Sequence, residues 1–441
     1  MSNHPAARLR TASLATLAAL SLAGCAALGL GGCSDAAGPD EGGEPITELP
    51  RELSVSERAV IEGSNAFGVE LFARVVAEDA RPNIVLSPLS ASMALGMTLN
   101  GADGTTFDAM RSTLGFGGLT QEEINTSYRD LIDLLRGLDP AVQFAIANAI
   151  WANELYAFHQ SFFDAVSAAF DASAESRDFG DPATLADINA WVDESTEGLI
   201  DSILDSLDPE LVMLLVNAIF FDGAWTTQFD PDDTRMQSFT RPDDSTVDVE
   251  MMTLTDAEVP LGGGPDYAAV ELPYGGEAFS MVVVVPQGAT PAREFAAALD
   301  SDAWESIVEG LAPRELGLLG LPKLTLEYDA FLNDALRAMG MDVAFVPGAD
   351  FTRMSPMGDR MCISFVRQKT FVEVDERGTR AAAVTAVGVG LTSEPPSLVV
   401  DRPFIFALRE RLSGTLLFVG LVEDPTAEAE GPAPYDNDCD P

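Results

Sequence analysis

The segment from Glu373 to Arg402 limits what this chain can fold into more than any other stretch. It is long, rich in Ala, Val, Thr and Gly, and has few charges away from its ends. Loops of this length without structure of their own are uncommon in compact domains and are usually functional or disordered. The composition lacks the charge and the Ser, Gln and Lys bias of a disordered linker.

Alternate residues of this segment differ in character, as residues of a strand do. Side chains on a strand point to opposite faces in turn, so the charged Arg380 falls on one face. The other face is small or apolar and consists of Thr379, Ala381, Ala383, Thr385, Val387 and Val389. We therefore interpret the segment as an exposed loop that can also become a strand with one buried face.

Five motifs mark the chain before, within and after this segment. They are NIVLSPLS at Asn83–Ser90, VNAIFFDGAW at Val216–Trp225, LPK at Leu321–Lys323, ERGTRAAA at Glu376–Ala383, and DRPFIF at Asp401–Phe406 with GTLLFVG at Gly414–Gly420. Their order and spacing resemble those of the serpin family from Ser54 to Thr426. The resemblance implies an α+β serpin fold: a single large domain with antiparallel-rich sheets, about nine helices and an exposed reactive-centre loop.

The resemblance also assigns roles to single residues. It implies that the hinge of the loop consists of Glu376, Gly378, Thr379, Ala381, Ala382 and Ala383. It implies that the shutter and breach of the central sheet include Ser87, Ser90, Asn217, Gln368, Trp225 and Lys323, and that Lys323 pairs with Glu376. The chain departs from the family pattern at Arg380, where Glu is usual, and at Gln368, where His is usual. Gln can still form hydrogen bonds through its amide.

The hydrophobic pattern predicts helices and strands along the whole domain. Helices are expected at 55–77, 90–99, 121–138, 184–203 and 329–339. Strands are expected at 142–152, 211–221, 280–285, 361–374, 404–408 and 415–422. Size alone would suggest two or three domains, but no linker interrupts residues 55–425 and the resemblance favours one domain over 54–426.

Charge and the ends of the chain bear on location and partners. The net charge of −45 argues against nucleic acid, anionic lipid and heparin-type activators as partners. All three are negatively charged and bind to basic protein surfaces. A basic start and a short apolar run predict a signal peptide over 1–24, ending before a bacterial lipobox at Cys25, or over 1–32 with Cys33 lipidated. An ordinary secretory peptide is the alternative. Residues 25–53 read as a disordered acidic Gly/Pro tether and residues 427–441 as a disordered tail.

We therefore expect an exported, monomeric protein that is lipid-anchored to a bacterial membrane, most simply the outer membrane, or extracellular. The four cysteines form no disulfide framework. Cys362 is interpreted as a buried free thiol, with a Cys362–Cys439 bridge as the alternative in an oxidising compartment.

Enzyme chemistry finds little support in the sequence. The two histidines are His4, in the signal peptide, and His159, at an aromatic loop-to-helix junction. A Ser-His-Asp triad or a Cys/His metal cluster needs more than these provide. No phosphate-binding glycine loop occurs, since Gly262–Gly264 precedes Pro265 and reads as a turn. No cofactor or metal is expected.

The resemblance implies a suicide inhibitor of a serine, or alternatively a cysteine, endopeptidase. The usual distance from the hinge glycine places the reactive bond at Thr392–Ser393, or at Leu391–Thr392 if the register shifts by one. No Lys or Arg lies between Arg380 and Arg402, so an elastase-like or subtilisin-like protease is expected. The alternative is a non-inhibitory serpin that acts as a binding or carrier protein.

Overall fold

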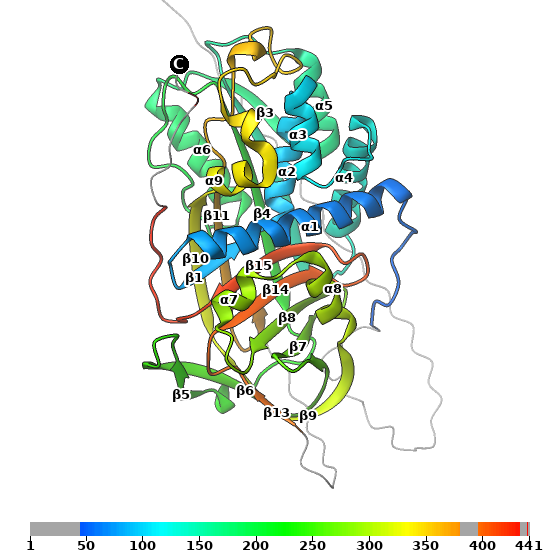
Figure 1. Ribbon diagram of the computed structural model, residues 1–441, viewed down its shortest axis with the longest axis vertical. Helices are drawn as coiled ribbons and strands as arrows, with labels where there is room; N and C mark the ends of the chain where they lie inside the picture. The colour runs from blue at the N-terminus through cyan, green and yellow to red at the C-terminus, as the bar shows by residue number, and fades with distance from the viewer. Residues whose placement is uncertain (1–44, 380–395, 433–438, 440–441) are drawn as a thin grey trace, which may run out of the picture. The chain divides into compact units, whose positions relative to one another are not determined.

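Three β-sheets organise the protein in a computed structural model that describes residues 45–379, 396–432 and 439 (Figure 1). The first has nine strands, in the order β1 (Asn83–Leu86), β15 (Leu416–Val422), β14 (Phe404–Glu410), β8 (Phe279–Pro286), β7 (Tyr267–Tyr274), β6 (Thr246–Gly263), β9 (Ala312–Pro322) and β13 (Ser397–Val399), with β5 (Arg235–Thr240) paired to β6. The second has the order β12 (Gly378–Thr379), β4 (Met213–Ala224), β2 (Val142–Asn153) and β3 (Ala172–Arg177). The third pairs β10 (Leu324–Phe331) with β11 (Arg367–Val374).

Nine α-helices lie in the described part of the chain. They are α1 (Val55–Glu78), α2 (Pro88–Leu99), α3 (Gly104–Thr113), α4 (Gln121–Arg136), α5 (Gln160–Phe170), α6 (Pro182–Ser195), α7 (Ala292–Ala297), α8 (Ser301–Glu309) and α9 (Asn333–Leu336). Capping boxes at Ser54–Glu57 and Thr120–Glu123 satisfy the first amides of α1 and α4. In α2, Ser87 caps the first turn and Pro88 occupies it.

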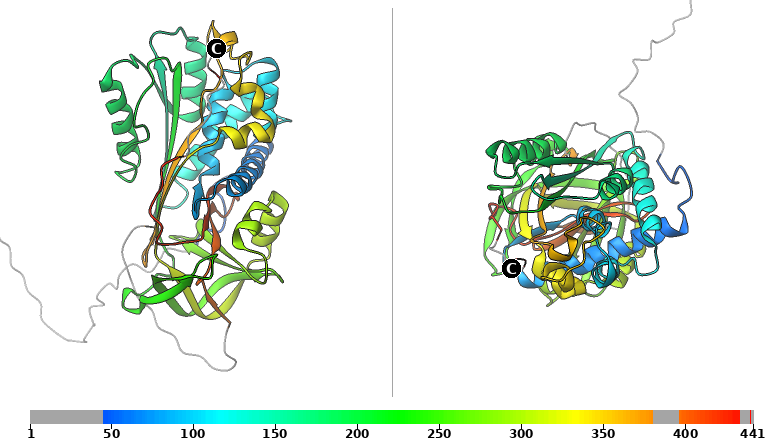
Figure 2. Two further views of the ribbon diagram at one scale, coloured as in Figure 1. Left: turned by 60° about the vertical axis from the view of Figure 1, so that its left-hand side comes forward. Right: turned by 90° about the horizontal axis from the view of Figure 1, so that it is seen from above.

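The four-stranded sheet lies between helices (Figure 2). Helix α6 covers one face of β2 and β4, and the buried α2 packs behind β4. The strands β8, β14 and β15 are buried along almost their whole length. A continuous apolar run suits a strand that is covered on both faces, so these strands form the centre of the hydrophobic core.

Three predicted elements have different bounds from those expected. The helix expected at 184–203 ends at Ser195, because Glu197 and Gly198 have φ of 50° and 81° and turn the chain. The helix expected from Asp329 begins at Asn333, because Asp329 still belongs to β10. The strand expected from Met361 begins at Arg367. The other expected helices and strands occur within a few residues of their predicted bounds.

Residues 45–53 and 427–432 of the two terminal segments belong to the described part of the chain. The N–H of Ile46 donates to the carbonyl of Gly276 at 2.7 Å, and Leu49 and Leu53 pack on the core. Cys362 is not a free thiol: it forms a disulfide with Cys439, with the Cα atoms 5.8 Å apart. The tail supplies the partner, so the alternative weighed from the sequence is the observed one.

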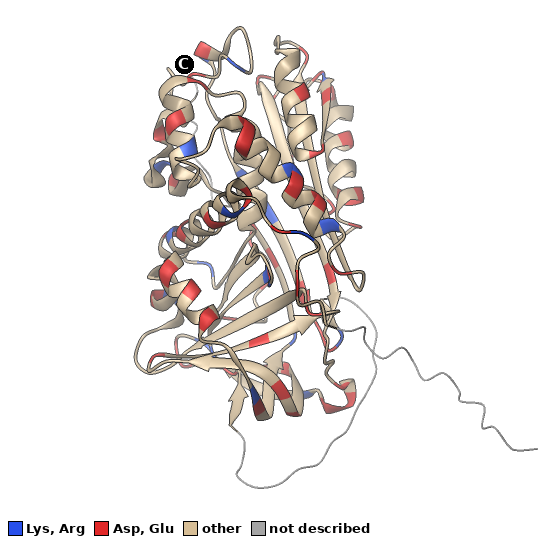
Figure 3. Ribbon diagram, turned by 90° about the vertical axis from the view of Figure 1, so that its right-hand side faces the viewer, with Lys and Arg blue, Asp and Glu red and all other residues tan. Residues whose placement is uncertain are grey.

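Asp and Glu residues are spread over many helices and loops of the ribbon (Figure 3). They follow from the 70 Asp and Glu residues against 25 Lys and Arg. None of the helices in the described ranges is long and apolar enough to cross a bilayer. In the same ranges, His, Cys, Asp and Glu side chains nowhere gather in a group of three that could hold a metal ion.

Candidate functional site

A slot between β4 and β11 is the main candidate site. β11 pairs with β10 on one edge, and β4 pairs with β2 on one edge and with the two residues of β12 on the other. In the described part of the chain, β4 and β11 do not pair with each other and belong to different sheets. Two cavities of about 120 and 30 Å³ lie along this slot. Their walls combine β4 from Leu214 to Phe221 with β11 from Arg367 to Val372, and α2 closes the larger one from behind.

The hinge occupies one end of the slot. After β11 the chain turns between Asp375 and Gly378, whose backbones bond to each other at 2.9 and 3.3 Å. Gly378 has a φ of 143°, and a Cβ at this position would lie 2.1 Å from the carbonyl oxygen of Gly223. Only glycine fits here. Gly378 and Thr379 then pair with β4 in antiparallel register, opposite Ala224 and Gly223.

Thr379 is already buried inside the protein. It is 6% exposed, and its Oγ1 lies 3.0 Å from the hydroxyl of Tyr274. Burial raises the pKa of Tyr274, more than the hydrogen bond with Thr379 lowers it, so the phenol stays protonated. The Tyr274 ring stacks on Trp225 with centroids 4.4 Å apart, and Trp225 Nε1 donates to the carbonyl of Asp375 at 3.0 Å. The expected breach residue Trp225 therefore holds the hinge turn directly.

An ion pair fixes the outside of this turn, as expected from the sequence. Lys323 Nζ lies 3.2 Å from Glu376 Oε2, and Thr234 Oγ1 donates to Glu376 Oε1 at 2.8 Å. Burial alone would raise the pKa of Glu376, but the bonds from Thr234 and Lys323 outweigh it and lower the pKa. Burial would also lower the pKa of Lys323, and Glu376 raises it instead. Both side chains therefore stay charged near neutral pH.

The expected shutter residues are brought together only in part. Ser87 and Gln368 bond reciprocally: the N–H of Ser87 donates to Gln368 Oε1, and Gln368 Nε2 donates to the carbonyl of Ser87, both at 2.9 Å. The N–H of Ser90 donates to Ser87 Oγ at 3.3 Å. Asn217 lies across the slot and donates instead to Asn148 Oδ1 on β2 at 2.5 Å. The Gln amide thus ties α2 to β11 but does not bridge to β4.

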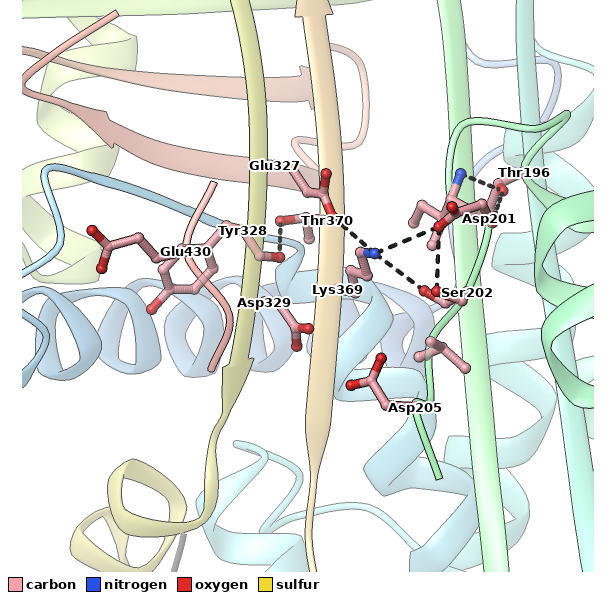
Figure 4. Close-up of polar contacts among 12 residues, drawn as sticks. Thr196, Asp201, Ser202, Asp205, Glu327, Tyr328, Asp329, Lys369, Thr370 and Glu430 are labelled. Atoms are coloured by element: carbon pink, nitrogen blue, oxygen red, sulfur yellow. Dashed lines mark hydrogen bonds and ion pairs between the residues drawn. The ribbon is translucent and has the colours of Figure 1, made fainter. Parts of the chain in front are cut away.

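The linker between α6 and β4 crosses the slot (Figure 4). Lys369 of β11 donates to the carbonyl of Ser202 at 3.2 Å and lies 4.0 Å from the carboxylate of Asp201. The same ammonium pairs with Glu327 of β10 at 2.8 Å. Ile203 of the linker lines both cavities. A strand that enters the slot along its whole length has to displace this linker.

Several predicted site residues lie outside the described residues. They are Arg380, Ala381, Ala382, Ala383, Leu391, Thr392 and Ser393 of the loop, and Cys25 and Cys33 of the N-terminal region. The structure adds partners that sequence reasoning missed, namely Tyr274, Thr234, Asn148 and Ser202. Tyr274 lies 105 residues before Thr379, and no local pattern links two such positions. Lys369 could have been found, because it is one of only two lysines in the chain.

Comparison with known proteins agrees with this geometry. The family model for Serpin (serine protease inhibitor) matches residues 62–425. Neuroserpin from Gallus gallus is 31% identical over 360 residues, which cover 78% of this chain and 87% of neuroserpin. The native state of tengpin, a thermophilic serpin, superposes with a TM-score of 0.76 at 30% identity, covering 86% of this chain and 97% of tengpin. Human thyroxine-binding globulin superposes with a TM-score of 0.76 at 27% identity, covering 84% and 100%.

The chain therefore belongs to the serpin family, whose members share this α+β fold and are in general serine protease inhibitors rather than enzymes.

Proposed function

We propose that this protein is an inhibitory serpin that traps an elastase-like or subtilisin-like endopeptidase as a covalent acyl complex. The observation that carries the proposal is the slot, with β12 seated at one end of it and two strand edges facing across it. The loop leaves the described structure from Thr379, already in strand register with β4. The small residues that follow fit a position covered on one face by α2 and crossed on the other by the linker.

The reaction proceeds by ordinary acyl transfer. The protease serine hydroxyl attacks the carbonyl carbon of Thr392, the C–N bond to Ser393 breaks, and the amine leaves with the proton taken from the hydroxyl. The ester then joins Thr392 to the protease. Freed from Ser393, residues from Thr379 to Gly390 add to the edges of β4 and β11, moving the ester by roughly 40 Å at ~3.3 Å per residue. Backbone pairing and burial of the small-residue face drive this step.

The composition of the loop supports the choice of target class. No basic residue lies between Arg380 and Arg402, so a protease with an acidic specificity pocket lacks a favoured bond. Small and medium apolar residues suit a shallow or hydrophobic pocket.

Incubation with a protease panel tests the proposal. Denaturing gels should show a band at the summed mass of inhibitor and protease with elastase-like or subtilisin-like enzymes, and none with trypsin-like enzymes. Cleavage of the loop by every protease, without a covalent band, would overturn inhibition. A catalytic-serine variant of the same protease is the control and should give no band.

A carrier function is the second candidate, because a pocket of about 320 Å³ lies away from the slot. It is walled by α1, α8 and the turn between β14 and β15, and Arg409 lines it beside the buried Glu271, 3.6 Å away. One solved relative is a complex of thyroxine-binding globulin with thyroxine. A thermal-shift screen with aromatic carboxylates tests this candidate, with Arg409→Met as the control that should lose any shift.

We further propose that the chain is exported and lipid-anchored through Cys25, or through Cys33. The apolar run ending in Leu22-Ala23-Gly24-Cys25 supports this. Mass spectrometry of the native protein should find a diacylglyceryl cysteine at the new N-terminus. A soluble protein with an unmodified N-terminus would contradict the proposal.

A further inference from the structure

The chain beyond the last strand does not leave the domain at once. Glu423 pairs with Arg293 at 2.6 Å, and Asp424 pairs with Arg241 at 2.6 Å. Asn83 of β1 donates to the carbonyl of Asp424 at 2.7 Å and accepts from the N–H of Glu423 at 3.1 Å. Four side-chain contacts thus fasten the start of the tail where β15 ends.

The tail then follows the outer edge of β10, the edge that faces away from β11. Arg81 Nη1 donates both to the carbonyl of Asp329 in β10, at 2.8 Å, and to the carbonyl of Glu430 in the tail, at 3.1 Å. Residues 427–430 and 326–328 enclose a space of only about 20 Å³. Figure 4 shows Glu430 beside Tyr328, on the side of β10 opposite β11. The tail therefore lies against this edge at residues 326–328.

A covalent bond holds the far end. Cys439 is joined to Cys362, which precedes β11 by five residues. Both cysteines are half-buried, so a reductant can approach the bond. We call residues 423–432 together with Cys439 the strap.

We propose that the strap keeps the outer edge of β10 from pairing with a second copy of this chain, and that reduction of the Cys362–Cys439 bond releases this protection. Among the described residues β10 pairs with β11 alone. The carbonyl of Asp329 points outward to Arg81, so by alternation the backbone groups of Thr325 and Glu327 point outward too. An uncovered edge of this kind is a template for another strand, and proteins commonly cover such edges with a loop.

The second copy is the favoured occupant because the chain itself presents the complementary element. The same β10 edge on another molecule can pair with it in antiparallel register around a twofold axis. The inference does not depend on protease inhibition, since it concerns an edge outside the slot.

Release requires a dithiol reductant, either small or a protein. One thiolate of the reductant attacks a sulfur of the bond and forms a mixed disulfide, and the other cysteine leaves as a thiolate that takes a proton. The second thiol of the reductant then displaces the remaining cysteine. Two electrons pass to the protein, which ends with two thiols, while the reductant becomes a disulfide. In an oxidising compartment the bond persists.

The test follows loss of monomer by size-exclusion chromatography of the full-length mature protein, at 0.5 M salt to screen its negative charge. Wild type with dithiothreitol, and Cys439→Ser without it, should lose monomer at least tenfold faster than oxidised wild type. The rate should rise with protein concentration, because pairing involves two molecules. Dithiothreitol should not accelerate Cys439→Ser further, which excludes an effect through Cys25 or Cys33.

Two further measurements separate edge pairing from general loss of stability. In the monomer fraction, hydrogen exchange of the peptide covering 324–331 should become at least tenfold faster on reduction. In the associated fraction it should slow again, because pairing protects the outward N–H groups, while exchange of β14 should not change in either fraction. Thr325→Pro in the Cys439→Ser protein removes one outward N–H and should restore the monomer; if this variant does not fold, the exchange result decides. An unchanged rate of monomer loss, or a loss independent of concentration, overturns the proposal.

Discussion

Two pairs of strands predicted from the sequence differ in how they are buried and paired: β14 with β15, and β4 with β11. β14 is paired on both edges, with β8 and β15, and nearly every residue of both β14 and β15 is buried. β11 is buried only at alternate residues and pairs on one edge. An apolar run therefore specifies a strand, but the neighbours decide whether its hydrogen-bonding capacity is used up. The slot between β4 and β11 keeps capacity that one more strand can use.

The largest effect should come from placing a charge at the first residue of the slot. Thr379→Arg should leave cleavage of the loop intact and abolish trapping, because Thr379 is 6% exposed and touches Tyr274. A buried guanidinium without a partner costs several kcal/mol. The substituted hinge therefore leaves its place beside β4 before cleavage, insertion cannot begin from it, and the ester hydrolyses first, so the inhibitor becomes a substrate. A protease assay with denaturing gels measures both outcomes.

Arg380→Glu is the matched control for this prediction. By alternation Arg380 belongs to the opposite face, so its exchange should change trapping less than twofold. Trapping that survives in Thr379→Arg, or disappears in Arg380→Glu, would show that the two faces of the inserted strand are not distinguished as argued.

The next effect concerns β14, the strand that is paired on both edges, in comparison with β11. Phe406→Ala in β14 should destabilise the protein by about 3–5 kcal/mol, because the ring is fully buried and leaves a cavity. Phe371→Ala in β11 should cost less than about 2 kcal/mol, because that ring is only half-buried. Urea unfolding of both variants checks the difference. Equal losses would mean that β11 is packed as tightly as β14.

Much of the fold could be predicted because apolar periodicity reports burial. The same fact explains one of the errors: Leu199 and Ile203 continue the helical period of α6, yet they lie in the linker after it and line a cavity of the slot. The pattern indicated contact with the sheet and was wrongly interpreted as helix. Helix α6 ends at Ser195 because the backbone turns at Glu197 and Gly198. The spacing of apolar residues does not reveal such a turn.

The site was predictable where a family motif names the residue and not where a contact joins distant segments. Lys323 and Glu376 pair as expected. Cys439 lies in a polar tail, and its distance to Cys362 depends on the whole path of the chain after β15. Asn217 was identified correctly by its motif, but its amide bonds to Asn148 of the neighbouring strand β2. It does not bond to β11, because β11 lies on the other side of the slot. Such hydrogen-bond partners depend on whether β4 and β11 are paired or separated, and the motif does not encode this.

A smaller effect is expected at the ion pair outside the hinge. Glu376→Gln should destabilise the hinge end of β11 by about 1 kcal/mol at neutral pH. The pKa of Glu376 is lowered in the folded protein, so its contribution is present above the unfolded pKa and is lost as pH falls through the folded pKa. The stability difference between wild type and variant should therefore vanish in acid. A difference that persists there would assign the role of Glu376 to shape and not to charge.

The smallest effect should come from the linker that crosses the slot. Lys369→Met keeps most of the aliphatic stem but removes the contacts with Ser202 and Asp201. Asp201 is 88% exposed, so its ion pair with Lys369 contributes little to stability. The loss of stability in the variant should be less than about 1 kcal/mol.

A synthetic peptide of residues 379–390 should enter the slot of the variant two- to fivefold faster than that of wild type, measured by native gel mobility. Glu327→Gln is the matched control: it removes the other partner of Lys369 but leaves the linker contact, and should not speed entry. Equal entry rates in Lys369→Met and wild type would mean that packing of Ile203, and not the lysine, holds the linker over the slot.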